Sequence, residues 1–268
     1  MKIDIRSMNT AELTELLTEL NQPKFRAAQL FKWLQSGVET FDEMTNIPKS
    51  LRETLAEKCY IANVEIERKF VSQIDGTVKY VYKLFDGEYI ESVLMKYEHG
   101  YTVCISTQVG CRMGCSFCAS GINGLYRNLT ASEMLAQIMK AGKDNNIRVS
   151  NVVMMGMGEP LDNFENSVKF LQLVSDDNGL NIGLRHISLS TSGVVSGIEK
   201  LKEYNFPVTL SISLHAPNDK IRDSMMKVNK KWNIDALLKA CKEEKWDLHR
   251  HAAAEIAACF QVKNCDYK

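Results

Sequence analysis

Hydrophobic positions in the first sixty residues recur at the spacing of an α-helix. Four leucines lie on one face of such a helix, namely Leu13, Leu16, Leu17 and Leu20. Thr10, just before them, is a suitable capping residue. We therefore expect residues 10–58 to be helical, with a turn at Asn21-Gln22-Pro23, and assign residues 1–60 to an N-terminal helical domain.

The stretch from Lys24 to Leu34 interleaves basic and aromatic side chains. Phe31 and Leu34 fit a small helical core better than stacking on bases. Lys24, Arg26 and Lys32 are candidates for contact with nucleic-acid phosphates. The pattern is weak evidence by itself, because amphipathic helices of ordinary domains also carry basic residues on their outer face.

Residues 61–98 change to short runs rich in β-branched and aromatic residues. Asp75-Gly76 and Asp86-Gly87 separate these runs and suit tight hairpin turns. We expect a short antiparallel β segment here. Glu91 lies in one of the runs, either as a solvated edge carboxylate or as a general base, and spacing alone does not separate the two roles.

Beyond Tyr101 short apolar runs alternate with amphipathic stretches, and we expect strands over 101–106, 151–155, 186–190 and 208–214. Alternating strands and helices indicate parallel strands and an α/β barrel or part of one. The polar segments that follow the four strands would then meet at one end of the barrel, where active sites of such folds are built. We place this core domain at residues 99–241.

Composition narrows the class of protein without deciding it. The chain has 268 residues, of which 45% are hydrophobic and 25% charged, enough for one large domain and a small companion. Basic and acidic residues balance at 33 each, so no global basic field favours nucleic acid. No apolar run approaches the roughly 20 residues that span a bilayer. We expect a cytoplasmic protein with no membrane contact.

Three cysteines, Cys111, Cys115 and Cys118, carry the strongest chemical signal. Their spacing resembles the signature of radical S-adenosylmethionine (SAM) enzymes, in which three thiolates hold a [4Fe-4S] cluster and one iron stays open to a cofactor. A structural zinc knuckle is the alternative, since Cys104 can supply the fourth thiolate that such a site needs. A disulfide framework is less consistent with a reducing cytosol.

The other strand ends supply candidate cofactor contacts. Gly158 and Glu159 follow the second strand, and the Glu159 carboxylate can accept hydrogen bonds from the ammonium group of SAM. Ser190 ends the third strand. The fourth strand is followed by further candidates, namely Ser213, Leu214 and His215. The simpler interpretation is a tight glycine turn, strand-capping serines and a core histidine.

Four longer segments together resemble one known family. They are residues 104–111, 155–160, 189–195 and 211–219. In this order they look like the RlmN/Cfr radical SAM methyltransferases, closest to the RlmN branch, over about residues 1–241. The resemblance implies a partial (β/α) barrel of the radical SAM type, after a small helical domain and an antiparallel β segment, with a [4Fe-4S] cluster and SAM as cofactors.

The resemblance also implies a reaction. In this family a methyl group placed on a cysteine near the C-terminus is activated by a SAM-derived radical and added to C2 of an adenine in 23S rRNA or tRNA. By motif position Glu91 matches the proton acceptor, and Cys104 matches the cysteine that resolves the protein–RNA adduct with formation of a disulfide. An electron donor such as flavodoxin or ferredoxin and a monomeric state are further expectations.

The tail, residues 242–268, departs from the family pattern. The remaining barrel strands do not follow Cys241, so we expect the barrel to be incomplete on its C-terminal side. Cys259 lies in a partial echo of the family's methyl-carrier motif, with Phe260 where glycine belongs, and is the candidate methyl carrier. The alternative function is a catalytically incompetent homologue, a cluster- or zinc-bearing RNA-binding remnant.

Overall fold

The computed structural model describes residues 2–242. Its N-terminal domain contains three helices and a short parallel strand pair: α1 Thr10–Glu19, α2 Arg26–Gln35, α3 Lys49–Lys58, β1 Ile3–Asp4 and β2 Cys59–Tyr60. The helices fall in the expected range. Asn9, rather than Thr10, caps α1, because its side-chain oxygen accepts the Glu12 N–H and the Glu12 carboxylate accepts the Asn9 N–H. Phe31 and Leu34 are fully buried, which confirms their place in the core.

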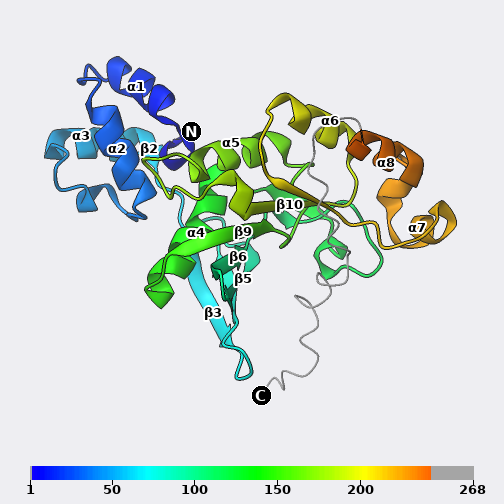
Figure 1. Cartoon of the computed structure of the whole chain (residues 1–268). Coiled ribbons are helices and arrows are strands. Elements are labelled where there is room, and N and C mark those ends of the chain that lie inside the picture. The colour runs from blue at the N-terminus through cyan, green and yellow to red at the C-terminus, as the bar shows by residue number, and fades with distance from the viewer. Residues whose placement is uncertain (1, 243–268) are drawn as a thin grey trace.

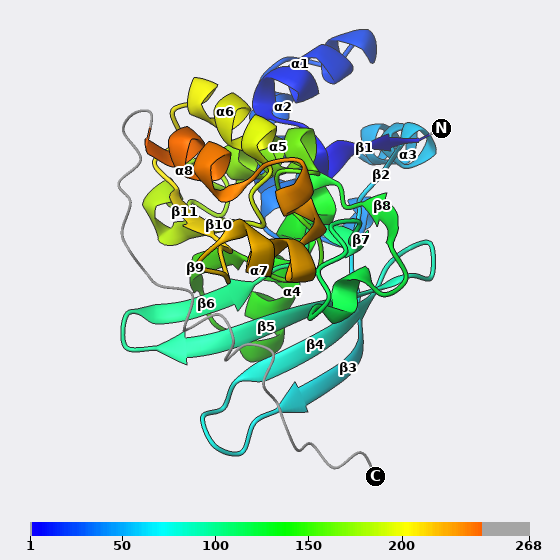
Figure 2. The ribbon, with the colours of Figure 1, turned by 90° about the vertical axis from the view of Figure 1, so that its right-hand side faces the viewer.

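One seven-stranded sheet forms the body of the molecule (Figure 2). Its strands are β3 Glu65–Val71, β4 Val78–Lys83, β5 Tyr89–Tyr97, β6 Gly100–Cys104, β9 Val149–Met154, β10 Ile187–Thr191 and β11 Thr209–Ile212. The order is β11-β10-β9-β6-β5-β4-β3. Strands β6, β9, β10 and β11 are parallel, as the alternating pattern predicted, whereas β3 to β6 pair antiparallel.

The antiparallel segment is therefore the edge of the same sheet and not a separate layer. Strand β6 joins the two parts, since it pairs antiparallel with β5 and parallel with β9. Gly76 and Gly87 make the two expected turns with positive φ values of 71° and 87°, a conformation that glycine adopts without a steric penalty. The consequence is that side chains of β4 and β5 share a face with those of the barrel strands.

The two faces of the sheet differ in chemistry. Five helices follow the strands: α4 Ala131–Asn145, α5 Phe164–Val174, α6 Val195–Glu203, α7 Asp219–Met225 and α8 Ile234–Lys242. Helices α4 to α6 cover the outer face (Figure 1), against which Ile90, Val103, Val152 and Leu189 are buried. The alternate residues of the same strands are polar or half-buried on the inner face. This is the arrangement of a partial barrel, with helices outside and a site inside.

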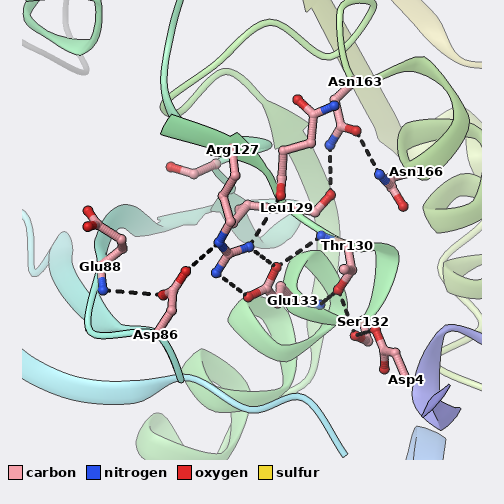
Figure 3. Close-up of polar contacts among 12 residues, drawn as sticks. Asp4, Asp86, Glu88, Arg127, Leu129, Thr130, Ser132, Glu133, Asn163 and Asn166 are labelled. Atoms are coloured by element: carbon pink, nitrogen blue, oxygen red, sulfur yellow. Dashed lines mark hydrogen bonds and ion pairs between the residues drawn. The ribbon is translucent and has the colours of Figure 1, made fainter. Parts of the chain in front are cut away.

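A small hairpin, β7 Gln108–Gly110 with β8 Leu125–Asn128, carries the three-cysteine loop. Figure 3 shows how Arg127 of this hairpin is held. Its guanidinium bonds both oxygens of Glu133, at 2.8 and 2.9 Å, and also the Asp86 carboxylate in the β4–β5 turn. Thr130 caps α4 in a capping box with Glu133. The hairpin is thus fixed to both the sheet edge and α4.

Within residues 2–242 no helix is long and apolar enough to cross a membrane.

Candidate active site

Strand register places Glu91 and Cys104 on the inner face of the sheet. Val93 of β5 pairs directly with Cys104 of β6, and Glu91 lies two residues before Val93, so all three side chains point to the same side. Cys104 is buried, at 2% exposure. The Glu91 carboxylate is 2.8 Å from the Lys79 ammonium, and both side chains are about two-fifths exposed. A partly exposed carboxylate and a buried thiol thus lie on the same face of the sheet.

Paired serines continue this polar face onto the parallel strands. The hydroxyls of Ser190 and Ser213 lie 3.5 Å apart, and those of Ser188 and Ser211 lie 2.9 Å apart. Ser190 and Ser213 were expected at the site from the strand ends. Ser188 and Ser211 were not, because only the pairing of β10 with β11 brings them together.

The three-cysteine loop connects β7 to β8 beside this face. Gly110, with φ of 75°, allows a close return, since a Cβ there would lie 2.0 Å from the Gly124 oxygen. Cys111 is buried, and Cys115 and Cys118 are half-buried. Burial raises the pKa of Cys111 to about 11, and the nearby charges of Glu159, Cys118 and Cys115 act in the same direction. The Cys118 N–H donates to the Cys115 oxygen at 3.1 Å, so these two residues lie side by side in the loop.

These thiols fit an iron–sulfur cluster by the chemistry of the donor set. Three soft thiol ligands on one loop are the donors that iron–sulfur clusters require. Within residues 2–242 no group of three or more Cys, His, Asp or Glu side chains is arranged to hold a single metal ion. Cys104 lies at the end of β6 and not on the loop of the other three cysteines. The six described cysteines are all free of disulfides.

Backbone hydrogen bonds join the glycine segment after β9 to the segment after β6. The Gly156 N–H donates to the Ile105 oxygen at 3.0 Å, and the Met157 oxygen accepts the Thr107 N–H at 2.8 Å. A Cβ on Gly156 would lie 2.7 Å from the Ile105 oxygen. Gly158 has a φ of 102°, and a Cβ there would lie 2.6 Å from the Gln108 Cβ. Both glycines are therefore required by close backbone contact, whatever they bind.

Gly158→Ala is expected to destabilise the protein and weaken SAM binding. The new methyl group meets Gln108 and the residue must keep a left-handed φ, which together should lower the free energy of unfolding by about 2–4 kcal/mol. Urea unfolding measures this change. Gly76→Ala is the matched control, because Gly76 also has a positive φ but nothing lies within 4 Å of its Cβ position. Equal losses in both variants would contradict the packing argument.

Glu159 is buried, at 3% exposure, and both oxygens of its carboxylate accept hydrogen bonds from backbone N–H groups. One oxygen accepts the Ser192 N–H at 2.7 Å and the other accepts the Leu161 N–H at 3.1 Å. Burial raises the pKa of Glu159, and the hydrogen bonds oppose that rise. In the structure Glu159 ties the loops after β9 and β10 together. Its contact with the ammonium group of SAM stays a prediction.

Arg222 of α7 ties the loops after β10 and β11 and is a residue that sequence reasoning missed. It is fully buried and donates to the oxygens of Ser192 and Leu214 and to the Asn229 side chain at 2.7 Å. Next to it, the rings of His215 and Phe117 meet edge to face at 5.2 Å. His215 thus contacts the three-cysteine loop. No spacing pattern in the sequence marks Arg222 as buried.

Ser106 and Gln137 form a second hydrogen-bond network that the sequence did not predict. The Gln137 amide accepts the Ser106 N–H and donates to the Ser106 oxygen, each at 2.9 Å. The Ser106 hydroxyl donates to the Glu91 backbone oxygen at 2.6 Å and accepts the Met157 N–H at 2.9 Å. One buried serine therefore links the strands of Glu91 and Cys104 with the glycine segment.

Cys259, the expected methyl carrier, lies outside the described residues.

Comparison with known proteins agrees with this geometry. The family described as "Radical SAM superfamily" matches residues 105–250, and "Ribosomal RNA large subunit methyltransferase N-terminal domain" matches residues 3–61. A solved radical SAM methyltransferase from Sphaerobacter thermophilus aligns with a TM-score of 0.83 and 40% identity, over 89% of this chain and 71% of that one.

Curated relatives are closer in sequence. The chain is 54% identical to the "Probable dual-specificity RNA methyltransferase RlmN" of Alkaliphilus oremlandii, over 90% of this chain and 70% of that protein. The protein of the same name from Alkaliphilus metalliredigens is 49% identical over 98% of this chain and 75% of its own length. That of Clostridium novyi is 50% identical over 89% and 70%.

A partial barrel with three loop thiols at the carboxyl ends of its strands defines a radical SAM enzyme, a class that uses a [4Fe-4S] cluster and SAM. More specifically, the chain belongs to the RlmN family of radical SAM methyltransferases. The predicted family, fold class and cofactors are thereby confirmed.

Proposed function

We propose that this protein methylates C2 of an adenine in 23S rRNA and in tRNA, through a methylated cysteine of its own chain. The single observation that carries this proposal is the pairing of Val93 with Cys104, which puts the Glu91 carboxylate and the Cys104 thiol on one face of the sheet. The relatives' name, dual-specificity RNA methyltransferase, supports the choice of RNA substrates.

Cys111, Cys115 and Cys118 would hold the cluster. With SAM bound, the cluster supplies the one-electron chemistry that an electron-poor carbon such as adenine C2 requires. Ser190, Ser213, Leu214 and His215 are proposed to contact SAM, because they line the end of the barrel beside the thiol loop. Gly158 lets the backbone of its segment approach that end closely.

Glu91 and Cys104 act on the substrate side. Glu91 takes the C2 proton of the joined RNA, and its ion pair with Lys79 at 2.8 Å orients the carboxylate on the inner face. The Cys104 thiolate then attacks the sulfur of the carrier cysteine: an S–S bond forms, the bond from that sulfur to the methylene carbon breaks, and the methylene carbon takes up a proton. The RNA leaves with a methyl group, and a disulfide joins the two cysteines. Residues 1–60, with Lys24, Arg26 and Lys32, are proposed to contact RNA phosphates.

The experiment that tests the proposal uses cluster-loaded protein, SAM, a reductant such as flavodoxin and an RNA fragment. We expect one methyl group on Cys259, detected by peptide mass spectrometry, and 2-methyladenosine in the digested RNA. Cys259→Ala should abolish both signals, whereas Cys265→Ala, another cysteine of the same tail, should keep them. A methyl group found on another cysteine would assign the role of methyl carrier to that cysteine instead of Cys259. RNA binding without either methylated product would favour the non-catalytic remnant.

A further inference from the structure

A cavity of about 550 Å³ lies at the seam between the N-terminal domain and α4. Its lining comes from Arg6, the end of α2 and the loop after it, residues 63–64, the second half of α4, residues 146–149, Leu180 and Ile182. Ligand pockets of proteins have volumes of about 300–1,000 Å³. Because α4 covers the outer face of the sheet, this cavity is separate from the site on the inner face, and none of its lining residues belongs to that site.

The polar lining of the cavity is strongly cationic. Its cations are Arg6, Lys140, Lys143 and Arg148, and Glu39 is the one carboxylate among the described lining residues. Lys140 and Lys143 share a single Glu39 oxygen, at 3.0 and 3.4 Å. One carboxylate cannot neutralise two ammonium groups. Positive charge is therefore left over for an anionic ligand.

Two further cations add to this excess. Arg148 is exposed and makes no ion pair with any residue between 2 and 242. Arg6 is a buried part of the wall, and its guanidinium donates to the neutral acceptors Ala62 O, at 2.6 Å, and Asn63 Oδ1, at 2.9 Å. Burial lowers the pKa of Arg6 only to about 10, so it remains charged at neutral pH. Its charge has no carboxylate in direct contact.

Eight lining residues are apolar: Val64, Ala136, Ile138, Met139, Ile147, Val149, Leu180 and Ile182. Ser36, Asn63 and Asn146 add neutral polar groups. Gln35 also contributes to the wall. It is 4% exposed, and neither its amide oxygen nor its amide nitrogen has a hydrogen-bond partner among the described residues. Buried amides normally have a partner. The cavity thus combines an apolar floor, a cationic rim and an unsatisfied polar group.

We propose that this cavity binds a nucleotide, with its base on the apolar floor and its phosphates on Lys140, Lys143 and Arg148. A flat heterocycle with a phosphate chain matches both halves of the lining, and its polar edge offers partners to the wall near Gln35. The concave shape favours a small molecule over an RNA strand, whose phosphates are met by extended basic surfaces.

Calorimetry with ATP, on cluster-loaded protein saturated with SAM, tests this site. We expect one ATP per chain. The double variant Lys140→Gln/Lys143→Gln should weaken binding by at least about tenfold, the scale of losing charge-assisted bonds to phosphate. Adenosine and inorganic triphosphate should each bind more weakly than ATP, because each uses only half of the lining.

Lys49→Gln is the matched control, since Lys49 is an exposed lysine on α3 paired with Glu53. It should leave ATP binding unchanged, and Lys140→Arg/Lys143→Arg should retain it. An absence of ATP binding, an unchanged affinity in the Gln double variant, or triphosphate binding as tightly as ATP would overturn the proposal. Competition by SAM or equal competition by a short RNA would also overturn it. The readout is binding, so its outcome is independent of the proposed methyl transfer.

Discussion

Replacing any one of Cys111, Cys115 and Cys118 with Ala is expected to abolish iron retention and the reductive cleavage of SAM. Three thiols bind three of the four irons of the cluster, so one iron stays open. The loop between β7 and β8 carries all three. Losing one leaves two irons without protein ligands. Iron analysis should fall from about four irons per chain to near zero, and 5′-deoxyadenosine should not form.

The controls separate the loop from other cysteines. Cys59→Ala removes a buried thiol of the N-terminal domain and should retain the full iron content. Cys104→Ala should also retain iron and SAM cleavage, because Cys104 lies on β6 and not on the loop. Loss of iron in Cys104→Ala would instead indicate a four-thiolate site.

Glu91→Gln is expected to leave SAM binding unchanged and to lower the yield of methylated RNA by about 10²–10⁴-fold, the range for loss of a general base. The substitution keeps the shape of the side chain and removes its ability to accept the C2 proton. A covalent protein–RNA adduct should therefore accumulate, visible as a shifted band on a denaturing gel. Cys104→Ala should trap the same adduct, because nothing then attacks the carrier cysteine.

Glu88→Gln is the matched control for Glu91. Glu88 is a half-buried residue in the β4–β5 turn, three residues away along the chain. It should keep full activity and form no adduct. Normal product yield in Glu91→Gln would remove the role of proton acceptor, and an adduct absent from Cys104→Ala would remove the resolving role.

Local sequence features predicted most of the fold. The turns at Asp75-Gly76 and Asp86-Gly87 and the four parallel strands formed where expected. Each depends on residues close together in the chain: a glycine that tolerates positive φ, or a run of apolar side chains. The predicted capping residue of α1, Thr10, was wrong by one position. Asn9 and Thr10 are both good capping residues, and only the contact with Glu12 selects Asn9.

The candidate site was predicted in part. The rule for parallel strands predicted that the segments after the four strands lie close together, and three contacts join them: Ser190 with Ser213, Glu159 with Ser192, and Phe117 with His215. The roles of these residues stay predictions. The bonds of Glu159 to the Ser192 and Leu161 amides were not foreseen. Those partners depend on how two loops pack, which no spacing within one segment specifies.

The sequence by itself determined the family, the cofactor chemistry of the three-cysteine loop and the order of strands and helices, because these are written in local motifs and periodicity. Only the tertiary structure decided that Glu91 and Cys104 share a face, and that Arg222 and Gln137 join the segments around them. The physical reason is register. A slip of one residue between β5 and β6 would turn Glu91 to the opposite face, and that register is set by contacts between segments distant in the chain.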